Sequence, residues 1–171
     1  MKFYMKQKVM SFVDKFTIYD EFENEAYWVE GELFSFGKKL DLFDNNNTHK
    51  AHIHQKVLSF LPRFFIEING EDVAEVVKHF TLFSQKFTVT GYDWEIDGDF
   101  LAHEYDIYRG DHTIATISKE WFTWGDAYSV DIADGVDPVP ILSVVLIIDA
   151  ILAQSNTGVD VVSDIISEII T

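Results

Sequence analysis

The sequence predicts a mainly β protein: a closed antiparallel barrel of roughly ten to twelve strands around a hydrophobic C-terminal helix. Three features indicate this fold: alternation of apolar and polar residues through most of the chain, frequent turn signals, and one long apolar run near the C-terminus. The 171 residues fit a single domain, and 47% of them are apolar, including 15 Phe. A chain of this size and composition buries a substantial core.

The alternating segments are separated by turn signals such as Asn69-Gly70, Asp97-Gly98 and Arg109-Gly110. Alternation with period 2 is typical of strands with one buried face. The barrel strands are therefore expected within about residues 9–136. The predicted strands cover residues 15–19, 26–29, 40–43, 51–55, 64–68, 73–77, 87–90, 105–108, 113–118 and 128–132.

The apolar run Val139–Ala153 predicts a helix over residues 140–153, with Pro140 in its first turn. It is apolar nearly all round, so it must be enclosed on every side. A barrel of more than about eight strands has a lumen that side chains alone do not fill, and a central helix fills it. The run is shorter than the ~18–20 residues of a membrane span, which favours a buried helix.

Asp149 lies inside this apolar run. A buried carboxylate is costly unless it is paired or hydrogen-bonded. We therefore expect a partner from the barrel lining, either a Lys, a Tyr hydroxyl or backbone amides. The alternative is a functional site at the barrel mouth.

An internal repeat relates two parts of the barrel. Shifting Ala51–Ile68 by 64 residues places it on Ala115–Ile132, so that Ile53 meets Ile117 and Phe64 meets Tyr128. In each copy an alternating segment leads into a corner and then into a second alternating segment. Two copies are too few for a solenoid or propeller, and they suit one sheet made of two related halves.

Three stretches carry a resemblance to a known family: GKKLDLFD with AHIHQKVLSFLPRFFI, IATISKEWFTWGDAYSVDI, and VVLIIDAIL. Over about residues 15–153 the chain resembles the LURP-one-related family of the tubby-like superfamily, which is related to the phospholipid scramblases. The resemblance implies a tubby-like barrel of about 12 strands around a hydrophobic helix. It also implies interaction with membrane lipid or with another protein. Tubby-like relatives bind phosphoinositide head groups through basic residues, whose nearest equivalents here are Lys38, Lys39, Lys56, Arg63 and Lys78.

Composition excludes several classes of function. With 13 basic and 29 acidic residues the net charge is −16, which opposes binding to nucleic acid and allows at most peripheral contact with a membrane. There is no Cys, so disulfides, thiolate metal sites and cysteine nucleophiles are excluded. No cofactor motif and no catalytic motif is present. We expect a cytoplasmic, non-catalytic binding or scaffold protein, or alternatively a carrier that holds a small apolar ligand at the barrel mouth.

The stretch Asp93–Glu104, DWEIDGDFLAHE, is close to the calcium loop of an EF-hand. An EF-hand needs a helix on each side, whereas both flanks alternate as strands do. We therefore expect a strand with Trp94 and Ile96 facing inward, acids facing outward, and a turn or bulge at Asp97-Gly98. A weak divalent-ion site remains the alternative, with Asp93, Glu95, Asp97 and Asp99 as its candidates.

The histidines His49, His52 and His54 form the pattern H-x-x-H-x-H. His52 and His54 share one strand face, where imidazoles are able to hold a metal ion. Such a site needs a third and a fourth ligand, and the sequence does not reveal them. We therefore expect solvent-facing histidines.

Aromatic residues gather at the corner of the second repeat, around Trp121 and Trp124. Together with Tyr128 and Asp149 they are expected to be structural, because buried aromatics dominate core packing. The alternative is an aromatic wall for an apolar ligand.

The C-terminal segment has helical spacing of its apolar residues over residues 158–170. Its polar face carries Asp160, Asp164 and Glu168. The expected role is a helix packed on the barrel, and the alternative is a seam for self-association or a protein partner.

Overall fold

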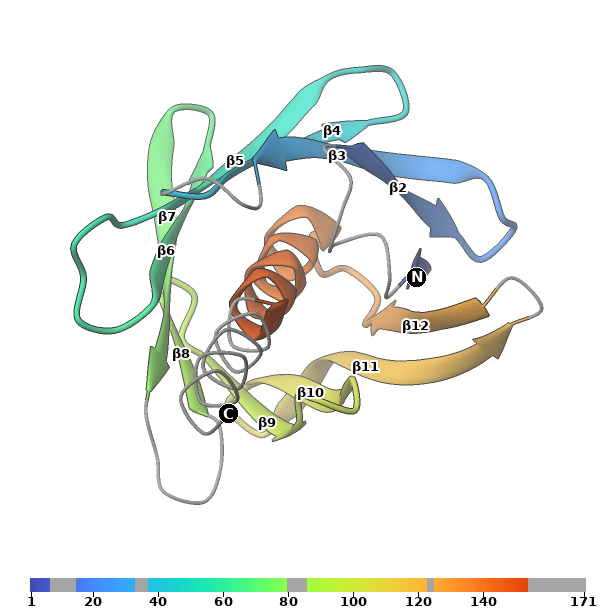
Figure 1. Ribbon diagram of the computed structural model, residues 1–171. Coiled ribbons are helices and arrows are strands. Elements are labelled where there is room, and N and C mark those ends of the chain that lie inside the picture. Colours follow the sequence, from blue (N-terminus) through green and yellow to red (C-terminus); the bar gives the residue numbers. More distant parts are fainter. Residues whose placement is uncertain (7–14, 33–36, 80–85, 123–124, 154–171) are drawn as a thin grey trace, which may run out of the picture.

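A computed structural model describes residues 1–6, 15–32, 37–79, 86–122 and 125–153. These residues form twelve strands closed into a barrel, in which every neighbouring pair is antiparallel. A helix over residues 138–153 passes through the barrel (Figure 1). The predicted fold class, a closed antiparallel barrel around a C-terminal helix, is confirmed.

The strands follow the alternating segments of the sequence. Around the barrel the order is β1-β12-β11-β10-β9-β8-β7-β6-β5-β4-β3-β2. The strands are β1 (Lys2–Lys6), β2 (Lys15–Asp20), β3 (Glu25–Glu32), β4 (Lys39–Asp44), β5 (His49–Gln55), β6 (Arg63–Ile68), β7 (Glu71–His79), β8 (Lys86–Thr90), β9 (Trp94–Asp99), β10 (Glu104–Arg109), β11 (His112–Phe122) and β12 (Gly125–Ile132).

The barrel begins earlier than the residue 9 expected from the sequence, because β1 starts at Lys2. This strand is short, and the aromatic Tyr4 lies between the apolar Phe3 and Met5. The sequence KFYMK therefore does not alternate clearly between apolar and polar residues. Phe3 and Met5 are buried, and the strand pairs with residues 127–131 of β12, the last strand in the sequence. Its place in the sheet is fixed by pairing over a long sequence distance, which local alternation does not reveal.

The core lies between the central helix and the inward faces of the strands. In strands such as β4 alternate residues are buried, as Leu40 and Leu42 are. The helix residues Val144 to Ile148 have no exposed surface. Helix and wall form one continuous apolar cluster, so the described part of the lumen is filled with side chains.

The helix begins two residues before the predicted start. The Asp137 carboxylate accepts a hydrogen bond from the Val139 backbone N–H at 3.0 Å, which caps the first turn. Pro138 occupies the first helical position, where its missing N–H costs nothing.

The internal repeat is confirmed in the strand register. In the β5–β6 hairpin Ile53 pairs with Ile66, and in the β11–β12 hairpin Ile117 pairs with Val130. Each residue of the second pair lies 64 positions after its counterpart. The two hairpins therefore share one register, as the sequence shift predicted.

The turn predicted at Asp97-Gly98 is wrong. Both residues lie within β9, where they pair with Asp106 and Tyr105 of β10 without a register shift. Gly98 has φ +137, and a Cβ there would lie 2.5 Å from the Glu104 carbonyl oxygen and 2.6 Å from the Tyr105 Cα. Glycine is required because β10 approaches closely, and not because the chain reverses. The reversal comes later, over residues 100–103.

The remaining expectation for this stretch is confirmed. In β9 Trp94 and Ile96 are buried, and Glu95, Asp97 and Asp99 are exposed. The side chain of Trp121, residue Trp124 and the segment 158–170 lie outside the described residues, so their expected roles stay predictions.

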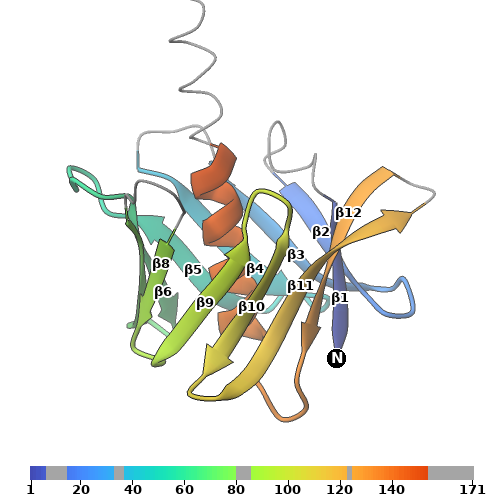
Figure 2. The same ribbon diagram turned by 90° about the horizontal axis from the view of Figure 1, so that it is seen from below.

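Because successive strands run in opposite directions, the connections fall at two ends (Figure 2). We call one the turn end: it holds the short connections β2–β3, β4–β5, β6–β7, β8–β9 and β10–β11, and the entry into the helix. The other, the loop end, lies at the top of Figure 2, where β1, β3, β5, β7, β9 and β11 end and β2, β4, β6, β8, β10 and β12 begin. The helix runs from the turn end to the loop end.

Candidate functional site

A buried polar cluster lies beside the helix near the loop end. Asp149 accepts a hydrogen bond from the hydroxyl of Tyr128, and its other oxygen lies 3.1 Å from His103 Nε2. The His103 and Tyr128 rings stack with centroids 4.5 Å apart. Asp149 therefore has the Tyr hydroxyl partner that the sequence predicted, and also a histidine that sequence reasoning missed.

The same cluster includes a second tyrosine, Tyr105. Burial, and after it the Asp149 carboxylate, raise the pKa of both Tyr105 and Tyr128 well above the usual value, so both hydroxyls stay protonated. The Tyr105 hydroxyl is buried and has no hydrogen-bond partner among the described residues. All four side chains are buried, so the cluster joins helix to wall and presents no open reaction site.

Lys38 makes a second connection between the wall and the helix. Its ammonium donates a hydrogen bond to the Ala150 carbonyl oxygen at 3.0 Å, close to the helix C-terminus as the helix dipole favours. Burial lowers the pKa of Lys38 from 10.5 to about 8. Lys38 is therefore an internal residue and does not face a ligand in solution.

The structure brings the five basic residues of the family resemblance together at the loop end of β4 to β7. Lys39 and Lys56 are exposed, whereas Lys38 and Lys78 are buried. Arg63 forms an ion pair with Glu75 at 2.7 Å. Two of the five, Lys39 and Lys56, thus face solvent without a described ion pair.

Further basic residues stand at the same end. Lys6, Lys15 and Lys86 are terminal residues of their strands there. The loop end also carries acids such as Asp99 and Glu104.

Large apolar side chains are exposed at the loop end, on the connection between β5 and β6. Leu58 is 93% exposed and Phe60 is 94% exposed. Val57 beside them and Leu101 in the β9–β10 connection are also exposed. Sequence reasoning missed this pair; the available signal is its position between Lys56 and Arg63, outside any predicted strand.

The turn end has the opposite charge. Acidic residues occupy or flank each of its connections, while the basic residues near it are Lys2, Lys50 and Arg109. Among the described residues, acidic side chains are therefore concentrated at the turn end of the barrel. The acids are Asp20, Glu21, Glu23, Glu25, Asp44, Glu71, Asp72, Asp93, Asp111, Asp134 and Asp137.

The acidic candidates of the calcium-like stretch lie apart from any described three-ligand group. Asp99 accepts a hydrogen bond from the Ala102 backbone N–H at 3.1 Å and so supports the β9–β10 turn. Within the described ranges, the group that brings three ligand atoms together is His54, Glu67 and Asp72. A weak site at Asp93, Glu95, Asp97 and Asp99 stays a prediction.

The three predicted histidines lie on the outer wall, where His52 and His54 share one strand face as expected. His49 Nε2 and His52 Nδ1 each lie 2.8 Å from the same Asp41 oxygen. The His54 ring stacks against the rings of His52 and Phe65. His49 is exposed, and the other two histidines are half-buried.

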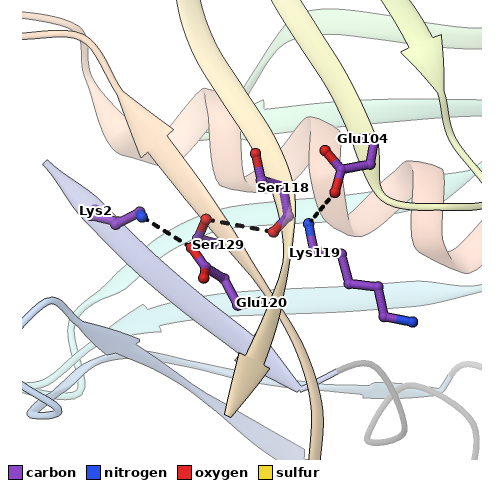
Figure 3. Close-up of polar contacts among 6 residues, drawn as sticks. All are labelled: Lys2, Glu104, Ser118, Lys119, Glu120 and Ser129. Atoms are coloured by element: carbon purple, nitrogen blue, oxygen red, sulfur yellow. Dashed lines mark hydrogen bonds and ion pairs between the residues drawn. The ribbon is translucent and has the colours of Figure 1, made fainter.

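Elsewhere on the outer wall, polar groups of different strands form ion pairs and hydrogen bonds with one another (Figure 3). Lys2 and Glu120 form an ion pair at 3.0 Å. The Lys119 backbone N–H donates to Glu104 at 2.9 Å, and the Ser129 hydroxyl donates to the Ser118 carbonyl oxygen at 3.5 Å. On this face the polar groups tie β1, β12, β11 and β10 together.

A family model, LURP-one-related, matches residues 1–149, which include every strand of the barrel and most of the enclosed helix. The chain belongs to the LURP-one-related family. The uncharacterized protein YxjI of Bacillus subtilis (strain 168) is 39% identical over 152 residues, covering 89% of this chain and 94% of that protein. An Arabidopsis thaliana protein solved by X-ray crystallography has a similar fold, with a TM-score of 0.63 and 19% identity over 88% of this chain and 90% of that one.

Within the part of the chain that the structure describes, no helix combines the length and the apolar character needed to cross a membrane.

Proposed function

We propose that this LURP-one-related protein is a non-catalytic binding protein that docks to anionic membrane surfaces with the loop end of its barrel. The observation that carries the proposal is the pair Leu58 and Phe60, which are 93% and 94% exposed on one connection. Large apolar side chains are unfavourable in water. When they are exposed side by side, they mark a surface that binds a partner or a membrane. Exposed Lys39 and Lys56 stand at the neighbouring strand ends.

The energies suit reversible, peripheral binding. Burying a Leu or Phe side chain contributes about 1.5–3 kcal/mol. A Lys near an anionic surface contributes about 1 kcal/mol. Two apolar side chains with two lysines are therefore sufficient for weak, salt-sensitive association with a membrane. This agrees with the expectation that membrane contact is at most peripheral.

The net charge of −16 does not oppose this orientation. Strands of five to eleven residues rise about 3.3 Å per residue, so the strands that separate the two ends of the wall are roughly 16–36 Å long. The Debye length at physiological salt is about 8 Å. The acidic turn end is therefore screened from a membrane that contacts the loop end.

The other functions receive less support. A carrier would need space beside the helix, whereas the described helix and wall form one apolar cluster. A surface hollow of about 690 Å³ opens instead at the turn end, between groups such as Glu21, Phe22 and Glu25. An enzyme would need an accessible reacting group, and the Asp149 cluster is enclosed. We further propose a cytoplasmic location, which is compatible with a chain that lacks cysteine.

Vesicle co-sedimentation tests the proposal. The full chain is mixed with vesicles of neutral phosphatidylcholine, or of phosphatidylcholine with phosphatidylserine, at low and high salt. We expect binding to the anionic vesicles at low salt, reduced by high salt. The double variant Leu58→Ser, Phe60→Ser should weaken binding by more than about tenfold.

Phe22→Ser is the matched control, because Phe22 is 76% exposed but lies at the turn end. It should bind as the unmodified protein does. No binding to anionic vesicles at low salt would overturn the proposal, and so would equal losses in the two kinds of variant. A protein docking to the same connection would then be the better explanation of its exposure.

A further inference from the structure

We propose that His54, Glu67 and Asp72 form a binding site for a divalent transition-metal ion, with Zn²⁺ as the best fit. The three side chains lie on the outer wall of β5, β6 and β7, and each offers one ligand atom within 4.8 Å of the others. This site is separate from the proposed membrane contact and does not depend on it.

The register of three neighbouring strands creates the cluster. Glu67 of β6 lies directly opposite Asp72 of β7, and on its other side it lies opposite His52 of β5. His54 is two residues beyond His52, so it shares the same outward face. A register shift between Ile66 and Glu67 brings Asp72 into place, because it leaves an extra residue in β7.

Without a bound ion, the carboxylates of Glu67 and Asp72 repel each other, and a cation would remove this repulsion. Like charges directly opposite each other destabilise an antiparallel pair. Glu67 and Asp72 are such a pair, and in the described structure neither carboxylate has a hydrogen bond or a salt bridge to a basic residue. Beside them, His54 Nδ1 is buried and has no hydrogen-bond partner among the described residues. A cation between the three side chains would neutralise the repulsion.

The imidazole is also held in place. The His54 ring lies between the ring of His52, at 5.5 Å, and the ring of Phe65, at 5.3 Å. His52 is in turn fixed by Asp41 at 2.8 Å. A ligand whose orientation is fixed before binding loses less freedom when the ion arrives, which favours affinity.

The donor set indicates the kind of ion. One imidazole nitrogen with two carboxylate oxygens suits Zn²⁺ and similar transition metals, whereas Ca²⁺ takes six to eight oxygen ligands. Zn²⁺ binds such ligands at about 2.0–2.2 Å, so tetrahedral ligand atoms stand roughly 3.4 Å apart. The ligand atoms lie within 4.8 Å of one another, so the cluster must close by at most about 1.4 Å to reach this spacing. Asp72 is exposed and free to make this movement.

Isothermal titration calorimetry of the full chain with ZnCl₂ tests the site. We expect one saturable site that CaCl₂ does not fill. His54→Phe, which keeps a stacking ring, and Asp72→Asn, which changes an exposed group, should each weaken Zn²⁺ binding by more than about tenfold. Circular dichroism confirms that both variants are folded.

His49→Gln is the control, because His49 and His52 share Asp41 and form the competing zinc-binding group on this wall. This variant should bind Zn²⁺ as the unmodified protein does. In NMR spectra of the unmodified chain, Zn²⁺ should shift the His54 imidazole resonances. The proposal is overturned if no saturable site is found, or if binding survives His54→Phe and Asp72→Asn and is lost in His49→Gln.

Discussion

The two ends of the barrel use their polar residues differently. At the turn end, the Asp20 carboxylate accepts the backbone N–H groups of Phe22 and Asn24 at 2.9 and 2.8 Å. Asp44 does the same for Asn46 and Thr48, both at 2.9 Å. These hydrogen bonds hold the pKa of both carboxyls below the usual value. The acids of these turns thus satisfy backbone groups that the reversal leaves unpaired.

The loop end carries groups that the described fold does not use. Leu58 and Phe60 are almost fully exposed, and Lys39 and Lys56 are exposed as well. Buried contacts at the same end, from Lys38 and Asp149 to the helix and wall, hold the structure together. The acidic side chains at the turn end thus have a local structural role. The exposed side chains at the loop end have no such role, so they are better candidates for function.

The largest effect should come from removing the buried carboxylate near the loop end. Asp149→Ala removes the carboxylate from its buried pairs with His103 and Tyr128. Breaking such a buried pair costs about 3–5 kcal/mol of unfolding free energy. Urea denaturation followed by circular dichroism measures the loss.

Ser143→Ala provides the comparison from the half of the helix nearer the turn end. The Ser143 hydroxyl donates only to the Val139 carbonyl oxygen of its own helix, at 2.8 Å. Its removal should cost about 1 kcal/mol or less. Equal losses in the two variants would show that the Asp149 cluster is not a special attachment of the helix to the wall.

The next largest effect is a difference in stability between alanine variants of two glycines with positive φ, Gly98 and Gly110. At Gly98 a side chain would overlap the Glu104 carbonyl oxygen of β10, whereas at Gly110, in the β10–β11 turn, nothing lies within 4 Å. Gly110→Ala should cost about 1 kcal/mol, from backbone strain alone. Gly98→Ala adds steric overlap, so its cost should reach about 2–3 kcal/mol. Thermal and urea denaturation of the two variants check this order; equal costs would remove the close approach as the reason for Gly98.

Most of the fold was predictable from the sequence, because strand alternation and helix apolarity are local patterns. The β4 alternation of Leu40 and Leu42 with charged neighbours gives its buried face directly. The 64-residue shift gave the register of two hairpins. The Gly98 turn was predicted wrongly because Asp-Gly is a turn signal, whereas the actual requirement comes from a neighbouring strand.

The sites were less predictable, because they depend on which residues meet across strands. His54 is visible in the sequence, but Glu67 and Asp72 become its neighbours through pairing and a bulge. His103 reaches Asp149 over 46 positions of the chain. Such contacts follow from register and side-chain reach, and a local pattern contains neither.

A smaller effect should appear in the pH dependence of stability. Burial lowers the pKa of Lys38 from 10.5 to about 8, so above pH about 8 the unfolded chain binds more protons than the folded one. Stability should therefore rise with pH between about 8 and 10, by at most about 1.4 kcal/mol per pH unit for this group. Above that range the buried tyrosines reverse the trend, since their pKa values are raised.

Urea denaturation across this pH range measures the slope. Lys38→Gln should have a flatter slope than the unmodified protein, because it removes the titrating group. Lys50→Gln, at the turn end, changes the net charge equally and should keep the slope. A Lys38→Gln slope equal to that of the unmodified protein would mean that Lys38 is not held in a desolvated environment.

The smallest effect should belong to an ion pair on the wall between the two ends. Lys2 begins β1 at the turn end, and it reaches Glu120 of β11 at 3.0 Å (Figure 3). The pair raises the pKa of Lys2 and lowers that of Glu120, but the side chains are 34% and 30% exposed. Solvent screening therefore limits their coupling to about 1 kcal/mol or less. A double-mutant cycle with Lys2→Ala and Glu120→Ala should give this coupling energy at low salt and nearly none at high salt. A larger coupling energy that does not depend on salt would make the wall pair comparable to the buried contacts at the loop end.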